Sequence, residues 1–194
     1  MKIVIDGNIG CGKTTVIKSL NDKLRIPIFL EPLQKWSDYL KLFYENPQKW
    51  AFPFNLEVLT TFAEWKHNLF PAIYERCPLS CRYIFTELNY DLGHLHKLEM
   101  ATFDKIYKDL KWEPEVLIYI RTDPSICSQR MKERGRSCES EVPKEYIQSV
   151  HDKYEAMINN ESIMKYIKFH IIDGNQEKEK VFNDICEILK TYVS

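Results

Sequence analysis

The stretch that decides the fold occupies residues 7–14 and reads Gly7-Asn8-Ile9-Gly10-Cys11-Gly12-Lys13-Thr14. It matches every defined position of the pattern G-x-x-x-x-G-K-[ST]. A short apolar run at residues 2–6 precedes it, and a helical pattern follows at residues 13–24. Glycines let backbone N–H groups approach phosphate oxygens, and the start of a helix adds partial positive charge. The stretch therefore predicts a strand, a phosphate-binding loop and a helix, in that order.

The same motif predicts how a nucleotide would be held. We expect Lys13 to bridge the β and γ oxygens of ATP and the Thr14 hydroxyl to hold Mg²⁺. The residues expected to contact the nucleotide here are Gly7, Asn8, Gly10, Cys11, Gly12, Lys13, Thr14 and Thr15. The alternative is a glycine-rich connector with a chance Lys-Thr pair, which the strand–loop–helix setting disfavours.

Strand-like and helix-like segments alternate along the rest of the chain. Strands are predicted at residues 26–30, 116–120 and 170–172, and residues 83–86 form either a strand or the start of a helix. Helical patterns cover residues 36–44, 55–74, 124–134, 143–159 and 178–193. The alternation predicts an α/β fold with a parallel sheet of about five strands covered by helices on both faces. With 194 residues, we expect a single domain over residues 1–194.

The composition excludes several classes of function. The 27 Lys and Arg nearly cancel the 28 Asp and Glu, so the charge does not favour nucleic acid as a partner. No apolar run approaches the roughly 20 residues that cross a bilayer, so we expect no membrane partner, and the N-terminus lacks a signal-peptide pattern. A cytoplasmic protein is expected. The six cysteines show no C-x-x-C spacing and the five histidines no metal-ligand spacing, so reduced thiols and no zinc site are predicted.

Four blocks occur in a fixed order along the chain. They are residues 7–14, then Glu31-Pro32 with Trp36, then Tyr44 through Trp50-Ala51-Phe52-Pro53-Phe54-Asn55, then Glu75-Arg76-Cys77 with Arg82-Tyr83. On these blocks the sequence resembles the deoxyribonucleoside kinase family, which includes deoxycytidine, deoxyguanosine, mitochondrial-type thymidine and insect multisubstrate kinases. The resemblance implies a P-loop kinase fold with an arginine-bearing lid. It also implies transfer of the γ-phosphate of ATP to the 5′-hydroxyl of a deoxyribonucleoside.

The resemblance assigns catalytic roles to three residues outside the loop. Glu31 matches the base that orients and deprotonates the 5′-hydroxyl. Arg76 matches the arginine that steadies the acceptor hydroxyl and the transferring phosphoryl group, and Glu75 matches the acidic residue that helps hold Mg²⁺. Taken without the resemblance, Glu31 is as readily a solvated side chain before a proline, and Glu75-Arg76 an exposed charge pair.

The resemblance also implies a lid. Arg134 and Arg136, with Arg130 before them, match arginines that close over the triphosphate and neutralise charge in the transition state. Composition alone favours a solvated basic helix face. Asp173, in the turn 173–175, is expected to border the adenine of ATP.

The nucleoside pocket is inferred from the same resemblance. Tyr44 and Glu139 match residues that bind the sugar 3′-hydroxyl, Phe85 matches an aromatic stacked on the base, and the wall positions are Trp36, Val58 and Phe62. Core packing is the alternative for these aromatic residues. The sequence departs from the family at Asn55, where a Gln reads the base, and at Cys77, where Ser is usual. Phe62 and Cys81 replace Met and Ala of the multisubstrate enzyme, and the crowding that they cause favours a pyrimidine.

Two other functions remain open from the sequence. A thymidylate-type nucleoside monophosphate kinase shares the loop, sheet and lid, although Glu31 would repel the phosphate of its acceptor. A nucleotide-binding regulatory module without turnover is the second. Because the resembled family is usually homodimeric through long helices, we expect a homodimer.

Overall fold

The computed structural model describes residues 1–24, 26–136 and 142–192. The chain separates into two compact units. Unit 1 comprises Met1–Leu30, Phe70–Glu75 and Pro114–Ser194, and unit 2 comprises Glu31–Leu69 and Arg76–Glu113. The sequence predicts that residues 1–194 form a single domain, which means that the two units fold together. This stays a prediction.

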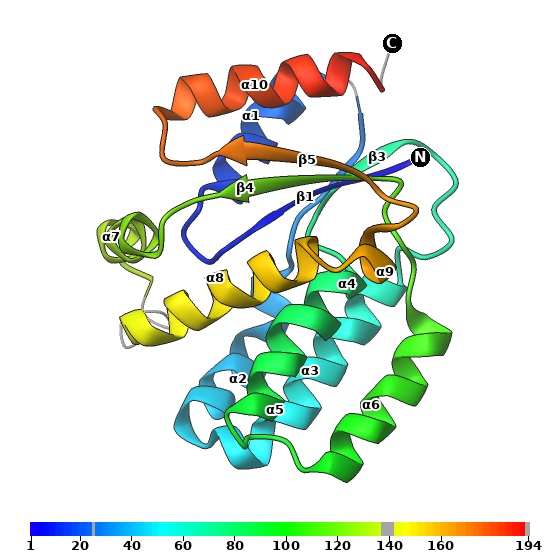
Figure 1. Ribbon diagram of the computed structural model, residues 1–194, viewed down its shortest axis with the longest axis vertical. Helices are drawn as coiled ribbons and strands as arrows, with labels where there is room; N and C mark the ends of the chain where they lie inside the picture. Colours follow the sequence, from blue (N-terminus) through cyan, green and yellow to red (C-terminus); the bar gives the residue numbers. More distant parts are fainter. Residues whose placement is uncertain (25, 137–141, 193–194) are drawn as a thin grey trace. The chain divides into compact units, whose positions relative to one another are not determined.

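Unit 1 is built around a parallel sheet. Within the described residues its five strands are β1 (Lys2–Gly7), β2 (Ile28–Phe29), β3 (Ala72–Glu75), β4 (Val116–Arg121) and β5 (Lys168–Asp173), in the spatial order β2-β3-β1-β4-β5 (Figure 1). Strand β1 is central, with Ile5 opposite Glu75 on β3 and Ile118 on β4. Its apolar side chains are fully buried because helices cover both faces of a parallel sheet.

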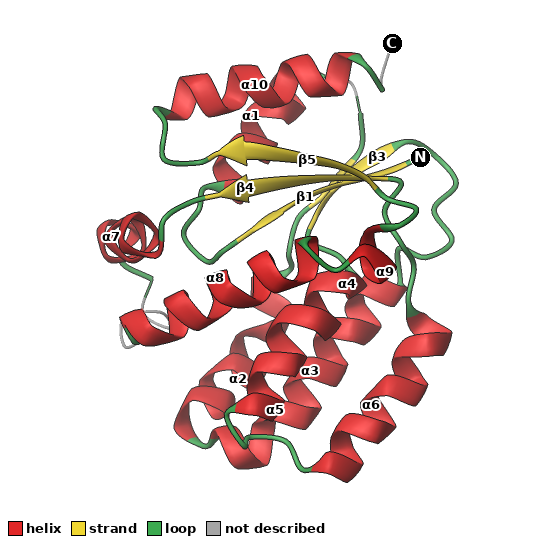
Figure 2. Ribbon diagram, in the orientation of Figure 1, coloured by secondary structure: helices red, strands yellow, loops and turns green. Residues whose placement is uncertain are grey.

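Helices flank this sheet on both sides. They are α1 (Lys13–Lys23), α7 (Pro124–Arg134), α8 (Lys144–Ile158), α9 (Glu161–Met164) and α10 (Lys178–Lys190). Figure 2 shows α1 and α10 on one side of the strands and α8 on the other. The α/β prediction with about five parallel strands is therefore confirmed, as are the helical patterns that became α1, α7, α8 and α10.

Unit 2 is helical. Its helices are α2 (Leu33–Glu45), α3 (Pro47–Ala63), α4 (Pro78–Ser80), the π-helix η1 (Cys81–Thr86), α5 (Glu87–Asp91) and α6 (Lys97–Leu110). Pro47 stands at the first turn of α3, where a missing N–H costs nothing, and Asn46 caps that helix by accepting from the Lys49 N–H. A buried cluster that includes Trp36, Phe62 and Phe103 joins α2, α3 and α6.

One prediction of secondary structure is wrong. The helix predicted at residues 55–74 ends at Ala63, and Ala72–Glu75 is a strand, because Pro71 interrupts a helix and the three-residue apolar run 72–74 is too short to show a helical period. For residues 83–86 the helical alternative is correct, since they belong to η1, in which the Thr86 hydroxyl donates to the Cys81 carbonyl at 2.8 Å. Helices α6 and α9 were not predicted.

In the part of the chain that the structure describes, no helix combines the length and the apolar character that crossing a membrane requires. The five described cysteines, Cys11, Cys77, Cys81, Cys127 and Cys186, are all buried, and none of them is joined to another by a disulfide bond.

Candidate active site

The phosphate-binding loop lies where its motif predicts, between β1 and α1 of unit 1. Gly12 precedes α1 with a left-handed backbone (φ 104°), and Lys13 begins the helix. The buried Lys13 ammonium donates to the Gly7 carbonyl at 3.0 Å and to the Asn8 carbonyl at 2.9 Å. The lysine is thus folded over its own loop, with its charge held at the N-terminus of α1, where anions bind.

Two loop glycines are required by close backbone approach. A Cβ on Gly7 would lie 2.6 Å from the Ile120 carbonyl oxygen of β4. A Cβ on Gly10 would lie 2.5 Å from the Cys127 carbonyl oxygen of α7. Both glycines also have positive φ, so a side chain at either position would push the loop off the sheet or off α7.

Thr14 and Glu75 form the candidate metal site. The Thr14 hydroxyl donates to the Glu75 carboxylate at 2.5 Å, and Glu75, the last residue of β3, is buried. Hydroxyl and carboxylate oxygens are ligands that Mg²⁺ accepts, and Mg²⁺ commonly completes its shell with water and substrate phosphates. The described residues contain no group of three His, Cys, Asp or Glu placed to hold a metal. The Thr14 hydroxyl and the Glu75 carboxylate offer two protein oxygens of the kind that Mg²⁺ takes as ligands.

Arg130 connects the loop to the last turn of the sheet. Its guanidinium donates to the Gly174 carbonyl at 3.0 Å and to the Cys11 carbonyl at 3.4 Å. Asp173 precedes that turn, and its carboxylate accepts from the Asn175 N–H at 2.9 Å. The structure therefore brings Arg130 and the 173–175 turn to the phosphate loop, whereas Thr15 is exposed on α1.

The predicted lid falls partly within the described chain. Arg134 ends α7 and is exposed, Gly135 follows with φ 63°, and Arg136 comes next. Glu139 lies outside the described residues.

In unit 2, Glu31 and Arg76 form an ion pair. Arg76 Nη1 lies 2.8 Å from both carboxylate oxygens of Glu31, and the two side chains are only 8% and 11% exposed. The guanidinium carbon also lies 4.8 Å from the centre of the Phe85 ring, a cation–π contact. Arg76 has φ 63°, the only positive φ of a non-glycine residue in the described chain, and such strain is concentrated at functional sites.

The predicted base-pocket residues gather in one cluster of unit 2. Trp36, Phe62 and Cys81 are buried in it with Val58 packed against them, and the Trp36 and Phe62 rings meet edge to face at 5.8 Å. Tyr44 is not among them, since it is 40% exposed on α2 with its ring against Phe43.

Asn55 is a buried polar residue of α3, near this cluster. It is 2% exposed, its carbonyl accepts from the Cys81 thiol at 3.6 Å, and its Nδ2 has no hydrogen-bond partner in the described part of the chain. A buried amide without a partner costs about 1–3 kcal/mol, so the Asn55 Nδ2 is a donor available to a bound molecule. Burial raises the pKa of the Cys81 thiol to about 12, which keeps it protonated.

Some residues around these sites escaped the sequence analysis. Phe103 and Tyr107 of α6 belong to the same cluster, and their helical spacing with Met100 could have revealed them. Arg82 pairs with Asp104 and Glu87, which no local pattern indicates.

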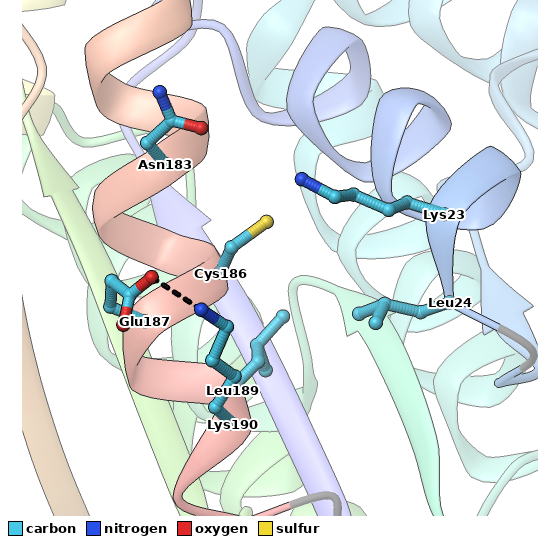
Figure 3. A pocket seen from close by; sticks show the side chains of 7 residues that line it. All are labelled: Lys23, Leu24, Asn183, Cys186, Glu187, Leu189 and Lys190. Carbon is cyan, nitrogen blue, oxygen red and sulfur yellow. Dashed lines mark hydrogen bonds and ion pairs between the residues drawn. The ribbon is translucent and has the colours of Figure 1, made fainter.

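A cavity of about 100 Å³ lies between the C-terminal end of α1 and α10 (Figure 3). Cys186 directs its sulfur into the gap, which Lys23 and Leu24 line from the other side. Because the phosphate loop lies at the opposite end of α1, this cavity is separate from the candidate nucleotide site.

The family model for deoxynucleoside kinases matches residues 3–194. The chain belongs to the deoxynucleoside kinase family. It is an enzyme of this phosphotransferase family, whose members phosphorylate deoxynucleosides. A probable deoxycytidine kinase of fowlpox virus (strain NVSL) is 30% identical over 210 residues, which cover 97% of this chain and 88% of that protein. A thymidine kinase of Ictalurid herpesvirus 1 (strain Auburn) is 27% identical and matches 95% of this chain and 84% of its own length.

A solved structure gives the same fold. Deoxyadenosine kinase from M. mycoides, solved with dCMP and dCDP bound, superimposes on this chain with a TM-score of 0.88 and is 27% identical to it. The match covers 99% of this deoxynucleoside kinase and 100% of the bacterial chain. The same bacterial enzyme has been solved with dCTP and with dATP.

Proposed function

We propose that the chain transfers the γ-phosphate of ATP to the 5′-hydroxyl of a deoxyribonucleoside, with Mg²⁺ as the metal. The observation that carries the proposal is the Glu31 carboxylate, which is only 11% exposed and which Arg76 holds through both oxygens. A carboxylate fixed in this way is a base that cannot rotate away from the alcohol it serves.

The reaction assigns one role to each of these groups. Glu31 accepts the proton of the 5′-hydroxyl while the alcohol oxygen forms a bond to the γ-phosphorus and the bond to the β-phosphate oxygen breaks, releasing ADP. Arg76 holds Glu31 and stabilises the phosphoryl charge. Lys13 exchanges the loop carbonyls for β and γ oxygens of ATP, and Thr14 with Glu75 holds Mg²⁺.

The donor side includes further residues. Gly7, Asn8, Gly10, Cys11 and Gly12 offer loop amides to the phosphates, with Thr15 in the first turn of the helix. We propose that Arg130, Arg134 and Arg136 neutralise the triphosphate and that Asp173 borders the adenine.

On the acceptor side, Asn55 is the proposed reader of the base. Its unpartnered Nδ2 is a donor, and its Oδ1 is an acceptor, so together they match one edge of a nucleobase. Phe85 stacks on the base, and Trp36, Val58, Phe62 and Cys81 form the walls. Tyr44 and Glu139 are the proposed ligands of the 3′-hydroxyl.

A pyrimidine is the proposed substrate, thymidine or deoxycytidine. The support is the packed Trp36–Phe62 pair beside Cys81, which leaves less room than smaller residues would. Deoxyadenosine is a second candidate, because the bacterial structures with the same fold are named deoxyadenosine kinase and an amide reads adenine equally well. We further propose a cytoplasmic homodimer.

The test is a substrate panel. Purified protein is incubated with MgATP and each of four deoxyribonucleosides, four ribonucleosides and the corresponding monophosphates, and products are separated by chromatography. The proposal expects 5′-monophosphates from deoxyribonucleosides, with a pyrimidine ranked first. Phosphate added only to monophosphates would favour a thymidylate-type kinase, and ATP binding without product would favour a regulatory module. Either outcome would overturn the proposal, whereas a deoxyadenosine preference would overturn only the pyrimidine assignment.

A further inference from the structure

Helix α8 contacts the base of the phosphate loop at two points. The Tyr154 hydroxyl donates to a carboxylate oxygen of Asp6 at 2.6 Å, and the Asn8 side-chain amide donates to the Ile147 carbonyl at 2.9 Å. All four residues are buried, and all belong to unit 1. Asp6 and Asn8 flank Gly7, the first residue of the loop, so α8 holds the chain on both sides of it.

A chain of contacts leads from Tyr154 to Lys13. The same Asp6 oxygen that accepts from Tyr154 also accepts from the Gly7 N–H at 2.8 Å. The carbonyl of Gly7 in turn accepts from the Lys13 ammonium at 3.0 Å. Because a Cβ on Gly7 would meet the Ile120 carbonyl at 2.6 Å, the Gly7 backbone is also packed tightly on β4. A shift of the Asp6 carboxylate would therefore turn the first loop peptide and move the group that holds Lys13.

We infer that Tyr154 and Asp6 are positioning residues for the phosphate loop, whose hydrogen bond sets the orientation of the Gly7 peptide and hence the affinity for the triphosphate. This inference rests on the proposed function in assigning the loop to ATP. Tyr154 acts through Asp6. The helix that carries it, α8, begins at Lys144, eight residues after Arg136 in the chain. One helix thus anchors the loop and follows the segment proposed as the lid.

Tyr119 provides a matched control for Tyr154. The two rings stack with centroids 5.3 Å apart and an interplanar angle of 14°, and both are fully buried. The Tyr119 hydroxyl donates to Glu155 at 3.1 Å, a carboxylate that Arg121 also binds, and it has no part in the contacts with the loop. Replacing either tyrosine by phenylalanine keeps the stack and removes one hydroxyl. Only one of the two hydroxyls reaches Asp6.

The experiment compares Tyr154→Phe and Tyr119→Phe in the full chain. The affinity for MgATP is measured by titration calorimetry without nucleoside, the KM values for ATP and nucleoside come from initial rates, and the melting temperature is recorded for each variant. We expect Tyr154→Phe to raise the Kd and KM for ATP about five- to tenfold, less than the full contribution of one hydrogen bond to a carboxylate, because Tyr154 acts on the loop through Asp6. The KM for nucleoside should stay within about twofold in both variants, and Tyr119→Phe should leave the ATP values within about twofold.

Unchanged ATP affinity in Tyr154→Phe would overturn the inference. Equal losses in both variants would also overturn it, because the effect would then not depend on the hydrogen bond to Asp6. The calorimetric Kd separates this test from that of the proposed function. If the wild-type chain binds MgATP but phosphorylates no nucleoside, the proposed function is refuted. The Kd values of Tyr154→Phe and Tyr119→Phe for MgATP still decide the inference.

Discussion

Arg76 Nη1 bridges both carboxylate oxygens of Glu31 at 2.8 Å, and the pair is almost entirely removed from water. Removing one partner of such a pair leaves an uncompensated buried charge, which typically costs about 3–5 kcal/mol. We therefore predict that Arg76→Met lowers the free energy of unfolding by about 3 kcal/mol in urea denaturation. The double variant Glu31→Gln, Arg76→Met should recover at least about 1 kcal/mol of that loss, because neither charge then remains. If the double variant instead loses as much stability as the two single variants added together, the ion pair is not a coupled unit.

The Thr14–Glu75 pair predicts a specific dependence on Mg²⁺. Glu75→Gln removes the charge and keeps the shape, so the Mg²⁺ concentration that gives half-maximal activity should rise about tenfold or more at fixed ATP. Glu115→Gln is the control, since Glu115 is exposed in the same unit and pairs with the N-terminus. The same Mg²⁺ requirement in Glu75→Gln as in the control would remove Glu75 from the metal site.

Asn55 and Asn89 are both 2% exposed, but among the described residues only Asn89 has a side-chain partner, His94, at 3.1 Å. Asn55→Leu should therefore leave the melting temperature unchanged or higher, since it removes an unpaired donor, while raising the KM for nucleoside about tenfold or more. Asn89→Leu should lower the stability by about 1–3 kcal/mol. Asn55→Gln should change the ranking of nucleosides more than the overall rate. A destabilised Asn55→Leu with an ordinary KM would mean that Asn55 serves the fold alone.

The buried thiols predict low reactivity. Burial raises the pKa of Cys81 and of Cys127 from 9.0 to about 12, so neither is an appreciable thiolate at pH 8. Iodoacetamide followed by mass spectrometry should find both unmodified in the native protein and modified in urea. Because the folded-state pKa lies above the unfolded value, the stability that these thiols contribute is complete below about pH 9 and declines as the pH rises toward about 12. Native modification of Cys81 at the rate seen in urea would contradict its burial.

The sequence predicts the sheet well where a motif or an uninterrupted apolar run marks a strand. Residues 116–120 are such a run and became β4, and residues 7–14 define the loop that joins β1 to α1. Strand β3 was missed because Ala72–Glu75 shows no alternation and follows a helical pattern, so only its pairing on both sides with β1 and β2 identifies it.

The sequence predicts those residues of the candidate site that belong to short motifs. Glu31 and Arg76 were both named from the family resemblance, but their pairing joins positions 45 residues apart and depends on tertiary structure. The strained backbone of Arg76 has no sequence signature, since arginine rarely adopts positive φ. The contact of Tyr154 with Asp6 spans 148 residues and no spacing rule reveals it.

The most direct test of the central claim is the turnover of Glu31→Gln. With the carboxylate replaced by an amide of the same shape, kcat should fall about 10²- to 10⁴-fold while the Kd for MgATP stays within about twofold. Glu64→Gln is the control, because Glu64 is an exposed partner of Lys35 in the same unit, and its kcat should match the wild type. A Glu31→Gln enzyme that phosphorylates its deoxyribonucleoside at the wild-type rate would contradict the assignment of Glu31 as the base.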